Sequence, residues 1–119
     1  MARWYAAAAI FVSASRYEPF GLAVLEAAQA GAALALSDIE TFRELWDGAA
    51  LFFAAGDARA LADILRRLQA EQSLRRQFAT RANARARHWS AEQMIAATLS
   101  VYAQVLPAYP GRQPPRSAA

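Results

Sequence analysis

This chain of 119 residues has no cysteine, no lysine and a single histidine, His88. The absence of cysteine excludes disulfides and thiolate metal sites. One histidine cannot by itself form a catalytic or metal-binding cluster, and without lysine no ammonium group can form a Schiff base or clamp a phosphate. No apolar run approaches the roughly 20 residues that cross a bilayer. We therefore expect a cytoplasmic protein without stable membrane insertion, without a metal and without a cofactor.

All 13 basic residues are arginines, and the formal net charge is +3. Two interpretations of this bias stay open. A GC-rich coding bias explains the arginine together with the abundant alanine, whereas selection for anion binding explains it through the bidentate guanidinium group. A length of 119 residues with 56% hydrophobic content suits one domain with a buried core.

The first half of the chain predicts strands that alternate with helices. Apolar runs predict short strands at residues 9–13, 33–36 and 50–53, and helical spacing predicts helices at residues 2–8, 22–30 and 41–46. Thr41 and Glu44 have the spacing of a capping box, which predicts that the last of these helices starts at Thr41. Alternation at short intervals indicates parallel βαβ units, so we expect an α/β, partial Rossmann-like domain of about three parallel strands.

After Gly56 the pattern predicts helices only. Asp57 is expected to cap a helix with an apolar stripe, formed by Leu61, Ile64, Leu65 and Leu68. A second helix follows, and a capping-box pattern at Ser90 predicts a third. Prolines then end regular structure, so we predict a domain over residues 1–107 and a disordered, Pro-rich tail over residues 108–119.

The most informative segment surrounds a Pro-Phe-Gly turn. Glu18 precedes this turn, Gly21 ends it, and Glu26 lies inside the helix that follows. The N-terminal end of a helix leaves backbone N–H groups free, and these attract phosphate and other anionic ligands. A carboxylate accepts two hydroxyl hydrogens at once, which suits ribose diols and sugar rings. Gly21 lets the backbone approach a ligand closely.

Matching segments on both sides of this turn extend over about residues 2–106. They lie at residues 11–22, 26–31, 37–38, 43–44, 47–52, 56–57 and 85–90. Together they resemble the C-terminal, nucleotide-sugar-binding domain of the family 4 glycosyltransferases. These are retaining enzymes with the GT-B fold.

The resemblance implies a role for each matching position. Glu18 corresponds to the signature carboxylate that contacts hydroxyls of the transferred sugar, which makes it the catalytic candidate. Glu26 corresponds to the carboxylate that holds the ribose hydroxyls. The backbone N–H groups of Phe20, Gly21 and Leu22 would face the diphosphate and the sugar. The implied activity is transfer of a hexosyl group from a UDP-, GDP- or ADP-sugar in carbohydrate biosynthesis.

Each of these residues also has a structural interpretation. A glutamate before a proline is usually a solvated turn residue, and Glu26 taken alone is typical of an exposed helix position. Glu44 is already explained by its capping-box spacing from Thr41, and Asp38 is typical of a turn.

Two parts of the family pattern do not precede residue 11 here: the segment whose arginine and lysine clamp the diphosphate, and the acceptor domain. We therefore expect a truncated half of a donor-binding domain that is either inactive alone or completed by a partner, which would be a companion chain or a second copy in a homodimer. Its first strand would be an exposed apolar edge. Two alternatives stay open. One is a non-enzymatic interaction module with an arginine-rich helical face, for which no nucleic-acid motif is present. The other is a stand-alone enzyme with an unusual acceptor mode.

Overall fold

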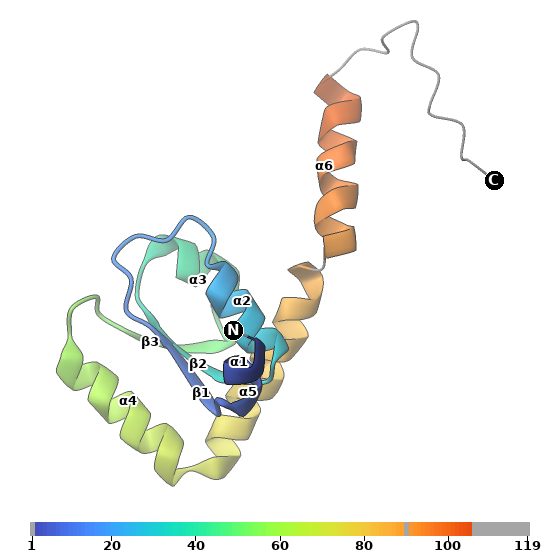
Figure 1. The fold of residues 1–119 in the computed structure, drawn as a ribbon. Coiled ribbons are helices and arrows are strands. Elements are labelled where there is room, and N and C mark those ends of the chain that lie inside the picture. The colour runs from blue at the N-terminus through green and yellow to red at the C-terminus, as the bar shows by residue number, and fades with distance from the viewer. Residues whose placement is uncertain (1, 90, 106–119) are drawn as a thin grey trace, which may run out of the picture. The chain divides into compact units, whose positions relative to one another are not determined.

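The computed structural model describes residues 2–89 and 91–105. The chain divides into two compact units, Met1–Trp89 and Ser90–Ala119. Helices and strands alternate as far as residue 70 of the first unit, and further helical segments follow, as Figure 1 shows. Its elements are α1 (Ala2–Ala7), β1 (Ile10–Ser13), α2 (Leu22–Gln29), β2 (Ala33–Ser37), α3 (Glu40–Trp46), β3 (Ala50–Phe53), α4 (Ala58–Ala70), α5 (Gln72–Ala86) and a 3₁₀ turn at Arg87–Trp89. The second unit contains α6 (Ala91–Val105).

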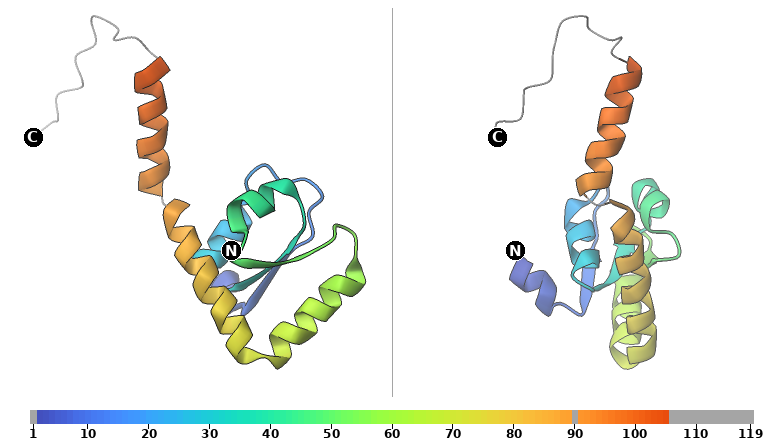
Figure 2. Two further views of the ribbon diagram at one scale, coloured as in Figure 1. Left: turned by 180° about the vertical axis from the view of Figure 1, so that it is seen from behind. Right: turned by 90° about the vertical axis from the view of Figure 1, so that its right-hand side faces the viewer.

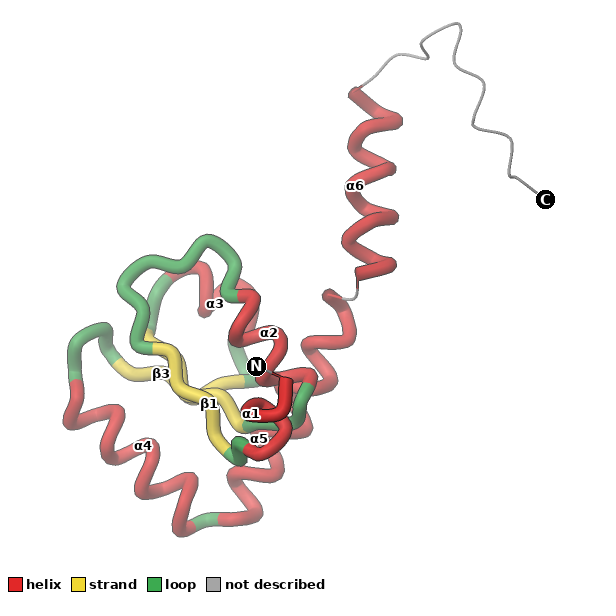
Figure 3. Tube along the Cα trace, in the orientation of Figure 1, coloured by secondary structure: helices red, strands yellow, loops and turns green. Residues whose placement is uncertain are grey.

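The strands, yellow in Figure 3, form one parallel sheet. Their order in the sheet is β1–β2–β3. Ile10 lies opposite Ala33, and Leu34 lies opposite Ala50. Because α2 joins β1 to β2 and α3 joins β2 to β3, the sheet consists of two overlapping βαβ units (Figure 2). All five residues of β2 are buried, as in a central strand that is covered on both faces. The predicted Rossmann-like α/β fold is confirmed.

The core of the first unit joins β2 to α2, α3 and α5. Trp46 and Phe42 of α3 are the largest fully buried side chains. α2 packs against α5, and Ala28 and Ala82 on these two helices are completely buried. Small side chains let two helix axes approach closely, so the alanine-rich composition serves this contact. α4 packs against β2 and β3 and buries Leu68 completely.

α2 ends in a Schellman motif. Gly31 adopts a positive φ of 90°. The N–H of Gly31 donates to the carbonyl of Ala28 over 3.1 Å, and the N–H of Ala32 donates to that of Ala27 over 3.1 Å. These two bonds satisfy carbonyl groups that the last turn leaves without helical partners. Gly31 therefore stops the helix, as predicted.

The capping box predicted at Thr41 is wrong. α3 begins one residue earlier, at Glu40, and its N-cap Ile39 makes no side-chain capping bond. The extended Ile39 backbone accepts the first helical bond from the Arg43 N–H over 3.0 Å. Thr41 is thus already inside the first turn, where its hydroxyl does not cap. Asp57 does cap α4, because its Oδ1 accepts the Ala60 N–H over 2.9 Å.

β1 is an edge strand in the described sheet, since β2 is its one strand neighbour there. Val12 is 37% exposed, and Ile10 and Phe11 are partly buried. The predicted exposed apolar edge is therefore present, whereas its pairing with another chain stays a prediction.

α6 carries an apolar surface that is exposed within its own unit. Ile95, Leu99 and Tyr102 lie on one side at helical spacing and are more than half exposed. The capping residue predicted at Ser90 and the tail predicted at 108–119 lie outside the described residues, as does the end of the predicted domain at residue 107. Among the described helices, none is long and apolar enough to cross a membrane.

Candidate functional site

The candidate site is built on the loop of residues 14–21, which we call the signature loop. It leaves the carboxyl end of β1 and leads into α2. In parallel α/β sheets, ligands bind outside the carboxyl ends of the strands. Within this loop, the Gly21 N–H donates to Oε1 of Glu18 over 3.2 Å. The structure therefore brings Glu18 and Gly21, two predicted site residues, into direct contact.

Gly21 meets two constraints that other residues would violate. Its φ is 84°, in the left-handed region that favours glycine. A Cβ atom at this position would lie 3.1 Å from Cε1 of Phe42 and 3.3 Å from Cγ2 of Val24. Gly21 thus lets the loop turn sharply into α2 while it lies against α3.

The start of α2 presents free backbone donors. Among the described residues, the N–H groups of Leu22, Ala23 and Val24 have no hydrogen-bond partner. The first helical bond runs from the Leu25 N–H to the carbonyl of Gly21 over 3.0 Å. Such a helix end carries about half a positive charge, which favours anions. The Gly21 N–H already donates to Glu18, so a ligand would have to compete with that carboxylate for it.

Glu26 is exposed on α2, while Val24, Leu25, Ala27 and Ala28 face the core. No hydrogen bond or ion pair engages its carboxylate within the described chain, so both oxygens are open to a ligand. Phe20 has a different position. Its ring packs edge-to-face on Trp89 at 5.7 Å between centroids, so its side chain anchors the loop and only its backbone can serve a ligand.

Arg16 was not predicted as a site residue, but it lies at the same edge of the sheet. A Cβ atom on Gly56 would lie 3.2 Å from Nη2 of Arg16, so this side chain reaches the turn after β3. Arg16 makes no ion pair within the described residues. A small cavity of about 160 Å³ lies here. It is lined by Ala14, Arg16, Phe53, Gly56, Asp57, Ala58 and Leu61.

Asp38, after β2, takes part in an ion-pair cluster. Arg43 donates from Nε and Nη2 to the two carboxylate oxygens of Asp38, each over 2.7 Å. Its Nη1 lies 3.3 Å from Oδ1 of Asp47, and its Cζ lies 4.1 Å above the Phe52 ring. The hydrogen bonds from Arg43 lower the pKa of Asp38, and they raise the pKa of Arg43 in turn. Because both of its carboxylate oxygens accept hydrogen bonds from Arg43, Asp38 is a structural residue. It holds the Arg43 side chain of α3 over the Phe52 ring of β3.

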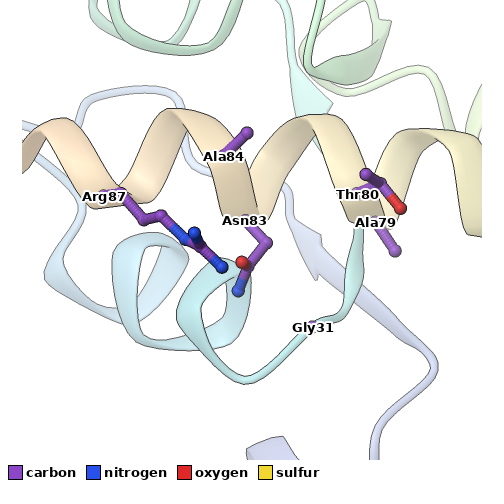
Figure 4. Close-up of a pocket in the computed structure, with 6 residues that line it drawn as sticks. All are labelled: Gly31, Ala79, Thr80, Asn83, Ala84 and Arg87. Atoms are coloured by element: carbon purple, nitrogen blue, oxygen red, sulfur yellow. The ribbon is translucent and has the colours of Figure 1, made fainter.

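The larger hollow shown in Figure 4 lies elsewhere and contains no predicted site residue. Its volume is about 430 Å³. Gly31, Ala79, Thr80, Asn83, Ala84 and Arg87 line it. The Asn83 side chain donates to the carbonyls of Ala28 and Gln29 over 3.1 and 3.0 Å, so it caps the C-terminal end of α2. This end carries the negative pole of the helix and is less suited to an anionic ligand.

Sequence reasoning also missed Ser37, whose Oγ–H donates to the carbonyl of Ser15 in the signature loop. A signal was present, because a serine that ends an apolar strand marks the carboxyl edge where loops gather. Among the described residues, no group of His, Asp and Glu is arranged to hold a metal ion.

A parallel sheet whose strands are joined by helices, with a helix N-terminus at its carboxyl edge, defines a Rossmann-like α/β fold. The family model for group 1 glycosyl transferases matches residues 1–85. The chain therefore belongs to this glycosyltransferase family, as the resemblance predicted.

Two curated relatives and a solved structure are consistent with this family membership. The chain is 32% identical over 114 residues to a D-inositol 3-phosphate glycosyltransferase of Xylanimonas cellulosilytica, a match that covers 94% of this chain and 27% of the relative. It is 39% identical over 64 residues to a lipopolysaccharide core biosynthesis mannosyltransferase of Rhizobium meliloti, which covers 50% of this chain and 18% of the relative. Sucrose-phosphate synthase from Thermosynechococcus elongatus superimposes with a TM-score of 0.79 at 27% identity, over 86% of this chain and 26% of that one. The chain thus spans about a quarter or less of each of these proteins.

Proposed function

We propose that this chain contributes the donor-binding surface for retaining glycosyl transfer from a nucleotide sugar. The observation that carries this proposal is the start of α2, where three free N–H groups lie between Glu18 and Glu26. Departure of a nucleoside diphosphate builds negative charge on its phosphates, and a helix N-terminus stabilises such charge without a metal.

The two carboxylates suit different parts of the donor. Glu18 is next to the helix start, where its own charge repels phosphate, so we assign it to hydroxyl groups of the transferred sugar. Glu26 is exposed and unengaged within the described residues, and we assign it to the ribose hydroxyls. Phe20, Gly21 and Leu22 would contribute backbone groups to the diphosphate and the sugar.

We further propose that the site is completed by groups beyond these. Arg16 is the one basic residue within the signature loop, and it reaches toward Gly56. With little positive charge opposite a diphosphate, transition-state stabilisation by this chain alone would be weak. A companion chain or a second copy would supply the remaining charge and the acceptor site. We therefore expect donor binding without rapid transfer.

Calorimetry with UDP, GDP and ADP at millimolar concentration tests the proposal. We expect weak binding of at least one nucleotide, and Glu26→Gln should weaken it roughly tenfold, because hydrogen bonds to a charged group contribute about 1.5–3 kcal/mol. Asp63→Asn is the matched control, since it removes the same charge from an exposed helix position that pairs with Arg66. Absence of heat with all three nucleotides, or equal weakening by both variants, would contradict the proposal.

The alternative of an arginine-rich interaction face finds less support. Arg66 and Arg67 pair with Asp63 and Glu71 on their own helix or its cap. Arg75 donates to the carbonyl of Leu68 over 2.9 Å. These guanidinium groups already have local partners, so we propose that the chain binds no nucleic acid. Salt-dependent retention on immobilised RNA would reverse this conclusion.

A further inference from the structure

We infer that Ser37 is a positioning residue for the signature loop: its hydroxyl holds Ser15 and thereby sets where Glu18 and the start of α2 lie. The inference rests on the proposed donor site for its functional meaning. The contact between Ser37 and the loop is independent of that proposal.

Ser37 has an unusual environment for a polar residue. It is completely buried, and among the described residues other than tryptophan it is the one polar or charged residue that is buried. A buried hydroxyl is unfavourable unless it forms a hydrogen bond. Ser37 meets this need by donating to the backbone carbonyl of Ser15, which lies 22 positions earlier in the chain.

The sheet register explains why the bond forms here. Ser13, the last residue of β1, lies opposite Leu36 of β2, so Ser37 extends one position beyond the end of β1. The signature loop must cross this position as it leaves the sheet. Ser13 also contacts the loop, with 3.2 Å between its Oγ and that of Ser15, but this bond engages a side chain. Ser37 holds the loop backbone itself.

The far end of the loop is fixed by a different contact. Gly21 lies against Phe42 and Val24, where a Cβ atom would find no room. Glu18 lies in the loop between these two fixed points, Ser15 and Gly21. Its Oε1 accepts the Gly21 N–H over 3.2 Å. If the Ser37–Ser15 hydrogen bond is lost, the loop backbone is no longer held to β2, and the positions of the Glu18 carboxylate and of the first turn of α2 become less fixed.

The amide of Gly21 offers a direct measure, because its hydrogen bond forms only when Glu18 is correctly placed. We would compare hydrogen exchange in wild type, Ser37→Ala, Ser37→Thr and Ser13→Ala, using the full chain. Ser37→Ala should speed exchange at Gly21 roughly threefold to tenfold, since one net hydrogen bond is lost. Ser37→Thr keeps the hydroxyl and should restore slow exchange, while Ser13→Ala should change little.

Binding of the nucleotide found by calorimetry is the second readout, and Ser37→Ala should weaken it by a similar factor with Ser37→Thr restoring it. Unchanged Gly21 exchange in Ser37→Ala would overturn the inference. So would an equal rise of exchange in all three strands, which would make Ser37 a general stabiliser. If the Ser37→Ala variant does not fold, the Ser37→Cys variant takes its place in the comparison, because a thiol is a weak donor of similar size to a hydroxyl.

The two proposals fail separately. If wild type binds a nucleotide and Ser37→Ala binds it equally well, the inference fails and the donor site stands. If wild type binds none, the donor site fails, and the exchange rates still decide whether Ser37 places the loop.

Discussion

Gly21 is constrained both by the turn into α2, which needs its positive φ, and by the packing of Phe42 from α3 against it. Gly21→Ala should destabilise the fold through its positive φ, at about 1–2 kcal/mol, and through the contact of the new Cβ with Phe42 at 3.1 Å, which adds about 1 kcal/mol or more. Gly48→Ala is the matched control, because Gly48 has a φ of 74° and open space around it. Urea unfolding should show the larger loss for Gly21→Ala. Equal losses would mean that Phe42 moves aside without cost.

Gly21 also shows how far single residues can be interpreted from the sequence. Its place after Pro-Phe and before a helix predicted a turn glycine near a ligand. The crowding by Phe42 could not be predicted, because Phe42 lies on a different helix whose packing depends on the whole core. The contacts of Ser37 with Ser15 and of Arg16 with Gly56 could not be predicted for the same reason, because they join segments at the ends of different strands.

At the scale of elements, the two capping patterns on α3 and α4 make a direct comparison. Asp57→Ala removes the acceptor of the Ala60 N–H and should cost about 1 kcal/mol. Thr41→Ala should cost less than about 0.5 kcal/mol, since no capping bond is lost and Thr41 is only partly buried. Thermal unfolding of both variants measures the difference. A larger loss for Thr41→Ala would show that its hydroxyl does stabilise the start of α3.

Most elements could be predicted because local signals and burial agree. The run at residues 33–36 is apolar on both faces and forms the central strand, and Gly31 ends α2 as its sequence position indicates. The start of α3 could not be placed from its Thr-x-x-Glu spacing. Asp38 pairs with Arg43, and the carbonyl of the extended Ile39 accepts the first helical bond, so other local contacts than a Thr41 cap place the boundary one residue earlier.

At the scale of the whole chain, β1 is an edge strand of the described sheet that another molecule could pair with. Edge strands leave N–H and C=O groups unpaired, and exposed apolar ones tend to pair with a second chain. We expect weak, concentration-dependent self-association through β1, since a strand of four residues offers few hydrogen bonds. Sedimentation velocity over a range of concentrations measures it.

Val12→Lys should abolish this association, because Val12 is 37% exposed on the edge strand and a lysine there disfavours edge pairing. Leu99→Lys is the competing variant, since Leu99 is 61% exposed on α6 and would interrupt an association that depends on that helix. Both positions are exposed, so neither substitution should lower the midpoint of thermal unfolding by much. Loss of association in Leu99→Lys alone would place the contact on α6 and contradict pairing through β1. Loss in Val12→Lys alone would make the free strand edge the surface that a second copy covers.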